Sequence, residues 1–167
     1  MKFIGEEDKI MLKFLKKCVI VSLVIFFSVG CSTSLTKSYT FKVETGDSVK
    51  VTLDISDKDN LKQKDGQFSI EKNKKILSQG VFINKSTYEQ YASMLLSNDD
   101  SNLSVIDKGK TDGYTYFFYE YKGDAGVEHD YVIWLKGSST GILIGSLKNK
   151  KIAQSVFEKL TFEIVDE

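Results

Sequence analysis

The sequence predicts an α+β fold, a single domain in which a mainly antiparallel sheet of about seven to nine strands carries two packed helices. Two patterns favour this class. Most of residues 39–167 alternates apolar and polar side chains between turns, and two segments have helical spacing. The composition, 41% hydrophobic and 28% charged in 167 residues, is that of one globular domain.

The domain is expected to open with a hairpin, because residues 39–43 and 49–55 alternate apolar and polar side chains around a turn. One face of the second strand is apolar, and its residues are Val49, Val51, Leu53 and Ile55. Residues 56–66 are expected to form a charged loop. Two further strands are predicted over residues 68–71 and 76–83, on either side of a turn.

Two helices are predicted from apolar stripes and capping residues. Ser86 and Glu89 fit a capping box, in which each side chain bonds to the backbone N–H of the other residue. The stripe that follows consists of Tyr88, Tyr91, Ala92, Leu95 and Leu96. Asn149 can cap the second helix. Its stripe consists of Ile152, Ala153, Val156, Phe157 and Leu160.

The remaining strands are predicted over residues 103–108, 114–121, 129–136, 142–147 and 161–165. The three middle ones are apolar on both faces, which is typical of strands inside a sheet that is covered on both sides. A helix on each face would give an α/β/α sandwich. This order of elements is loosely similar to the PsbP-like domains of several bacterial lipoproteins and of a photosystem subunit, and the similarity carries no functional residue across.

The N-terminal region has the pattern of a secretory signal. Basic residues precede an apolar run over residues 18–29, which is too short for a membrane-spanning helix. The ending Phe27-Ser-Val-Gly-Cys31 resembles the lipobox of bacterial lipoproteins, although Ser28 stands where that family most often has Leu. The resemblance implies cleavage after Gly30 and diacylglycerol on the Cys31 sulfur. The alternative is an uncleaved signal anchor with an unmodified Cys31.

The resemblance divides the chain into three parts. Residues 1–30 are the leader and signal peptide, residues 31–38 are the lipidated cysteine with a flexible tether, and residues 39–167 are the globular domain. Acidic residues within positions 1–10 fit a signal poorly, so Met11 is our hypothesis for the true start. The membrane is then a partner through the acyl chains on Cys31. Balanced charge, with 23 basic and 23 acidic residues, gives no basic surface for nucleic acid.

A search for chemistry predicts no catalytic residue, no metal site and no cofactor. His129 is the one histidine, and a solvated or edge-strand role is expected for it. The chain has no arginine and no glycine-rich phosphate loop. Carboxylates at Asp54, Asp57 and Asp59 have oxygen atoms that suit Ca²⁺, but neighbouring lysines offset their charge, and a solvated loop is expected there.

Aromatic residues are concentrated in residues 114–121. Alternation places Tyr114, Tyr116 and Phe118 on one face of the strand, and it places Phe117, Tyr119 and Tyr121 on the other. Packing inside the sheet explains these residues. A functional interpretation is a ligand- or partner-binding surface, since Tyr and Trp combine apolar area with a polar tip. Its residues would be Tyr114, Tyr116, Tyr119, Tyr121 and Trp134.

The expected function is therefore that of a membrane-anchored, extracytoplasmic lipoprotein of non-enzymatic type that binds a partner protein or ligand at the cell envelope. An immunity-type or ligand-sequestering lipoprotein is one alternative. The other is a carboxylate-based hydrolase, which would need two carboxylates roughly 5–9 Å apart in a cleft, one of them with a raised pKa.

Overall fold

The computed structural model describes residues 35–97, 100–124 and 126–165. The expected signal peptide, the Met11 start and the lipobox with Gly30 and Cys31 lie outside the described residues. Neither of the two helices in the described part of the chain is long and apolar enough to span a membrane.

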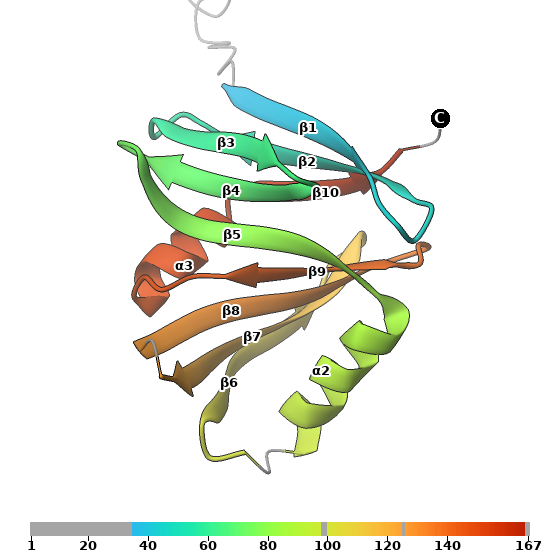
Figure 1. Ribbon diagram of the computed structural model, residues 1–167, viewed down its shortest axis with the longest axis vertical. Helices are drawn as coiled ribbons and strands as arrows, with labels where there is room; N and C mark the ends of the chain where they lie inside the picture. The colour runs from blue at the N-terminus through green and yellow to red at the C-terminus, as the bar shows by residue number, and fades with distance from the viewer. Residues whose placement is uncertain (1–34, 98–99, 125, 166–167) are drawn as a thin grey trace, which may run out of the picture. The chain divides into compact units, whose positions relative to one another are not determined.

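The structure confirms an α+β fold dominated by antiparallel strands (Figure 1). The elements are β1 (Thr36–Lys42), β2 (Ser48–Asp54), β3 (Asp59–Lys64), β4 (Gln67–Lys72), β5 (Lys75–Asn84), α2 (Lys85–Ser97), β6 (Leu103–Lys110), β7 (Tyr114–Gly123), β8 (Gly126–Leu135), β9 (Thr140–Gly145), α3 (Lys150–Phe157) and β10 (Leu160–Ile164).

The strands form two sheets rather than one. The small sheet has the order β1-β2-β10, and the large sheet has the order β3-β4-β5-β9-β8-β7-β6. The strands β7, β8 and β9, which are apolar on both faces, each have a neighbour on both sides, as predicted. One face of the large sheet packs against the small sheet and α3, and we call it the inner face. The other face, the outer face, carries α2.

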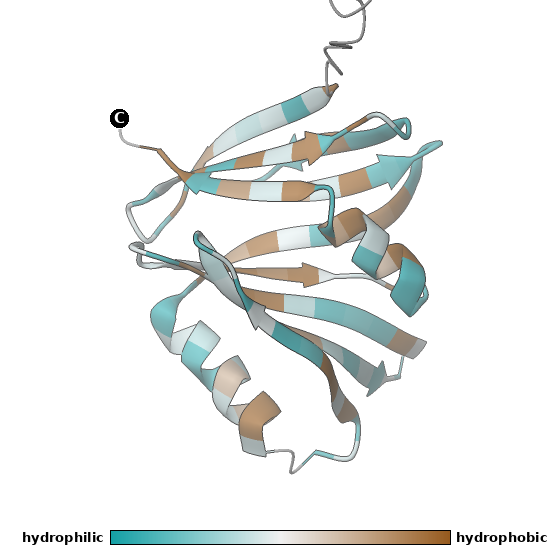
Figure 2. Ribbon diagram, turned by 180° about the vertical axis from the view of Figure 1, so that it is seen from behind, coloured by the Kyte–Doolittle hydropathy of each residue, from teal (hydrophilic) through white to brown (hydrophobic). Residues whose placement is uncertain are grey.

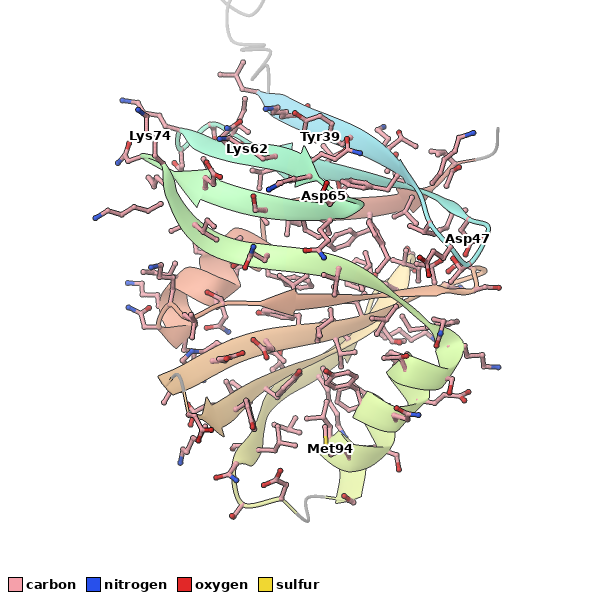
Figure 3. All side chains as sticks on the ribbon, in the orientation of Figure 1. Tyr39, Asp47, Lys62, Asp65, Lys74 and Met94 are labelled. Atoms are coloured by element: carbon pink, nitrogen blue, oxygen red, sulfur yellow. The ribbon has the colours of Figure 1, made fainter. Side chains whose placement is uncertain are left out.

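The outer face holds the smaller apolar cluster. Leu95 of α2 is buried against Val132 of β8, Tyr119 of β7 and Leu103 of β6. The predicted stripe of α2 is only partly correct, because Leu96 is 62% exposed. Figure 2 shows the molecule from behind, with α3 on the inner side of the large sheet, and Figure 3 labels Met94 on the exposed part of α2.

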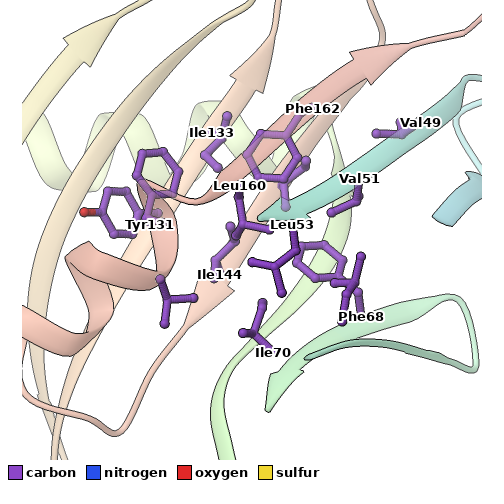
Figure 4. Packing of buried hydrophobic residues seen from close by; sticks show 14 of the residues in the cluster. Val49, Val51, Leu53, Phe68, Ile70, Tyr131, Ile133, Ile144, Leu160 and Phe162 are labelled. Atoms are coloured by element: carbon purple, nitrogen blue, oxygen red, sulfur yellow. The ribbon is translucent and has the colours of Figure 1, made fainter. Parts of the chain in front are cut away.

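The inner face holds the main core (Figure 4). Val49, Val51 and Leu53 of β2 are fully buried there, as the predicted apolar face of this strand requires. The helix α3 contributes Phe157, whose ring stacks on Tyr131 with the centroids 3.8 Å apart. The sheet therefore has a helix on each face, as in an α/β/α sandwich, but the small sheet shares the inner face with α3.

Three further expectations differ from the structure. The expected charged loop contains β3, an edge strand in which Leu61 is the buried apolar residue, so backbone pairing with β4 stabilises a segment that has no apolar pattern. The strand β1 begins at Thr36, three residues before the expected start of the domain. The helix α2 begins at Lys85, and the Asn84 side chain accepts a bond from the N–H of Thr87 (2.9 Å), so Ser86 lies inside the helix.

Candidate functional site

The aromatic strand β7 places its side chains on two faces. Tyr114 and Tyr116 lie on the inner face, where both rings contact Phe157 of α3. The Tyr116 hydroxyl donates a hydrogen bond to Asp107 (3.0 Å). Tyr119 lies on the outer face and is 3% exposed. Burial raises the pKa of the Tyr119 hydroxyl, so this group stays protonated.

The other two aromatic candidates, Trp134 and Tyr121, lie apart from these tyrosines and from each other. The Trp134 ring lies against Tyr88 of α2, with centroids 5.2 Å apart. Tyr121, near the end of β7, is 38% exposed. The structure therefore does not bring Tyr114, Tyr116, Tyr119, Tyr121 and Trp134 together on one surface. All of them except Tyr121 pack against neighbouring side chains, which agrees with the interpretation of this segment as packing inside the sheet.

A buried carboxylate on the outer face of β8 was not singled out from the sequence. Asp130 is paired in register with Tyr119, is 7% exposed, and accepts hydrogen bonds from the Tyr119 hydroxyl and from the N–H of Ser146 (3.3 Å). Burial raises the pKa of Asp130 to about 6, with a further contribution from the charge of Glu128. An acidic residue within a strand that is apolar on both faces was the signal in the sequence.

A shallow cleft lies beside this carboxylate. It has a volume of about 370 Å³, and its lining includes Glu128, Gly145, Leu147 and Ile76. A side chain at Gly145 would contact the Asp130 carboxylate, so the glycine keeps the space beside it open. Glu128 and Asp130 are two residues apart on one strand and share the outer face.

His129 lies on the inner face and has two structural partners. Its Nδ1 lies 2.9 Å from the carbonyl oxygen of Lys148, so this nitrogen carries a proton and donates. Its Nε2 lies 3.5 Å from the Glu120 carboxylate. The side chain is 9% exposed, which differs from the solvated position expected for it. These contacts join β7, β8 and the segment before α3.

Two of the three carboxylates considered for Ca²⁺, Asp57 and Asp59, lie beside lysines, whereas Asp54 accepts a hydrogen bond from the N–H of Ser56. The Lys159 ammonium lies 2.7 Å from Asp57 and 2.8 Å from Asp59, and Lys72 lies 3.4 Å from the other oxygen of Asp59. The bond to Lys159 lowers the pKa of Asp57. Burial opposes the charge on Lys159, but its bonds to both carboxylates outweigh this effect and raise its pKa. The lysine thus supplies the positive charge that a metal would.

A groove lies between the end of β1, the β3–β4 turn and the junction of β5 with α2. It has a volume of about 540 Å³. Val43, Phe82 and Ile83 give it an apolar floor, and polar side chains that include Glu44 and Asp65 line it as well. An apolar floor with polar groups around it suits a small ligand or a segment of a partner protein.

Comparison of the sequence with protein-family models and with curated proteins gave no match.

Proposed function

We propose that this chain is a lipid-anchored, extracytoplasmic protein that acts by binding at the cell envelope. The observation that carries the proposal is the lipobox-like ending at Gly30 and Cys31, followed within five residues by the first strand of a folded domain, at Thr36. Two or more acyl chains on one cysteine hold a protein firmly at a membrane, whereas a single chain does not.

Binding is favoured over catalysis by the roles of the polar groups in the described residues. His129 and the Asp57–Asp59 pair are engaged with neighbouring elements. The groove between β1, the β3–β4 turn and β5 is the candidate binding site, and its ligand would need both apolar area and hydrogen-bonding groups.

Lipidation is tested with the full chain in a bacterial host that is fed an alkyne-labelled fatty acid. The wild-type protein is expected to take up the label, to fractionate with membranes and to give a mature mass that begins at Cys31. Cys31→Ala is expected to lose the label and to accumulate as the precursor. Cys18→Ala is the matched control, which is expected to keep the label and the mature mass of the wild type. An unlabelled wild-type chain would contradict the proposal.

Binding in the groove is tested by photocrosslinking in cells. A photoreactive residue at Glu44 or Asp65, which line the groove, is expected to give a discrete adduct that depends on Cys31. The same residue at Asp112, an exposed position in the β6–β7 turn, serves as the control. Equal adducts at the groove and control positions would contradict a binding role for the groove.

The carboxylate hydrolase remains a second candidate because of one observation. Asp130 has a pKa raised to about 6 and shares a strand face with Glu128, and alternate strand residues lie about 7 Å apart. Hydrolysis of envelope glycan would support it if Asp130→Asn and Glu128→Gln abolish turnover while Glu163→Gln, on the exposed side of β10, does not. No hydrolysis by the wild-type protein would contradict it.

A further inference from the structure

Three chain segments meet at the end of the domain where β1 begins (Figures 1 and 3). The N–H of Ile55 donates to the carbonyl of Leu35 (2.8 Å), so the β2–β3 turn lies against the start of β1. The first residue of β3, Asp59, pairs with Lys72 at the end of β4. The β4–β5 turn with Lys74 is therefore at the same end. We call these three segments the anchor end.

Exposed lysines from separate turns gather at the anchor end. Lys58 lies in the β2–β3 turn, Lys74 lies in the β4–β5 turn, and Lys75 begins β5. All three are exposed, and none takes part in an ion pair within the described residues. Lys74 and Lys75 are adjacent in the sequence, and the fold brings Lys58 to the same end of the domain.

The acidic residues of the anchor end offset part of this charge, and lysines other than Lys58, Lys74 and Lys75 pair with two of them. Lys159 bridges Asp57 and Asp59, and the Asp54 carboxylate accepts a hydrogen bond from the N–H of Ser56 (2.9 Å). Glu158, next to Lys159 at the end of α3, is exposed. Both turns present ammonium groups to solvent, because Lys58 and Lys74 are exposed.

Apolar side chains accompany the lysines. Leu35 is 60% exposed directly before β1, and Ile76 is 47% exposed directly after Lys75. Lysine with exposed aliphatic residues is the combination that binds at the boundary between lipid headgroups and acyl chains.

We propose that the anchor end faces the membrane and that Lys58, Lys74 and Lys75 bind anionic phospholipid headgroups there. This inference rests on the proposed lipid anchor. Covalent geometry limits the chain between Cys31 and Thr36 to about 17 Å, so an acylated Cys31 keeps the start of β1 at the membrane surface. Each lysine in contact with anionic lipid raises partitioning about five-fold.

The test is amine footprinting by mass spectrometry of the full-length lipidated protein. The protein is compared in vesicles of phosphatidylglycerol and phosphatidylcholine, in vesicles of phosphatidylcholine alone, and in neutral detergent. In the anionic vesicles Lys58, Lys74 and Lys75 are expected to react about five-fold more slowly than in detergent. The exposed lysines Lys108, Lys110 and Lys136, away from the anchor end, are expected to react equally in all three.

Matched variants distinguish protection that depends on lysine charge from steric shielding of the lysines by the bilayer. In Lys58→Gln/Lys74→Gln the protection of Lys75 is expected to fall to its value in phosphatidylcholine alone, whereas Lys108→Gln/Lys110→Gln leaves it unchanged. Equal reactivity of the two lysine sets in a chain whose intact mass shows acylation would overturn this inference and leave the anchor standing. A mature chain without acylation would overturn both.

Discussion

At the scale of single residues, Asp130 couples folding to pH. Its pKa is raised to about 6 from an ordinary 3.8, chiefly by burial, so the folded protein binds this proton more tightly than the unfolded chain does. The ionised carboxylate therefore costs stability above about pH 6, and the cost disappears as the pH falls towards about 4. The shift corresponds to about 3 kcal/mol at neutral pH.

Asp130→Asn, which keeps an acceptor for the Ser146 N–H, is expected to raise the free energy of unfolding by about 2–3 kcal/mol at neutral pH and by almost nothing near pH 4. Urea unfolding at a series of pH values measures this difference. Asp112→Asn, at an exposed turn position, is the control that should leave the pH profile unchanged. A constant difference between Asp130→Asn and the wild type across this pH range would show that burial does not control this carboxyl group.

Lys159 is the second residue with a large expected effect. Lys159→Gln would leave the Asp59 side chain, which is 2% exposed, with only the more distant Lys72 as a charge partner. Removing one partner of a buried pair is costly, so we expect a loss of about 2–3 kcal/mol in urea unfolding. Lys50→Gln breaks an exposed pair with Glu163 and should cost less than about 1 kcal/mol. Equal losses would contradict the burial argument.

At the scale of elements, α3 is held to the inner face chiefly by Phe157. Its ring stacks on Tyr131 and also contacts Tyr116, with centroids 5.6 Å apart. Phe157→Ala is expected to lower the free energy of unfolding by about 3–4 kcal/mol, because a large cavity would remain beneath the helix. Ile152→Ala, on the same helix but 36% exposed, should cost about 1 kcal/mol. Similar costs at both positions would mean that α3 does not depend on this face.

The elements also show what the sequence could predict. Alternation identified most strands, and Asn149 does cap α3, accepting from the N–H of Ile152 (3.1 Å). The edge strand β3 could not be predicted from its own residues, because its pairing with β4 supplies what its composition lacks. The division into two sheets also escaped prediction, since it depends on which distant strands pair.

The candidate site was less predictable than the fold. Tyr114 and Tyr119 were correctly placed on opposite faces of β7, yet the same alternation separates them in space, so they cannot form one surface. The significance of Asp130 depends on its burial and on Gly145 of the neighbouring strand β9. Burial is a property of the tertiary structure, and a period-two pattern gives only the face on which a residue lies.

At the scale of the whole molecule, the two sheets share one core. Leu53 of β2 and Phe162 of β10, from the small sheet, belong to the same buried cluster as Ile133 of β8 and Ile144 of β9, from the large sheet. The Asp47 carboxylate also accepts from the N–H of Ser139 (2.8 Å), which links the hairpin of the small sheet to the β8–β9 turn. The small sheet therefore cannot keep its apolar face covered once the large sheet unfolds.

This shared core predicts cooperative unfolding. Trp134, the one tryptophan, reports on the outer face, whereas far-ultraviolet circular dichroism reports on both sheets, and the two signals should give one urea midpoint. Phe162→Ala removes a ring that packs edge-on against Tyr114, 5.9 Å away. It should lower both urea midpoints equally, and the free energy of unfolding should fall by about 3 kcal/mol. Ile164→Ala, 37% exposed on the same strand, should hardly move them. Separate midpoints for the two signals would instead show that the small sheet and the large sheet unfold independently.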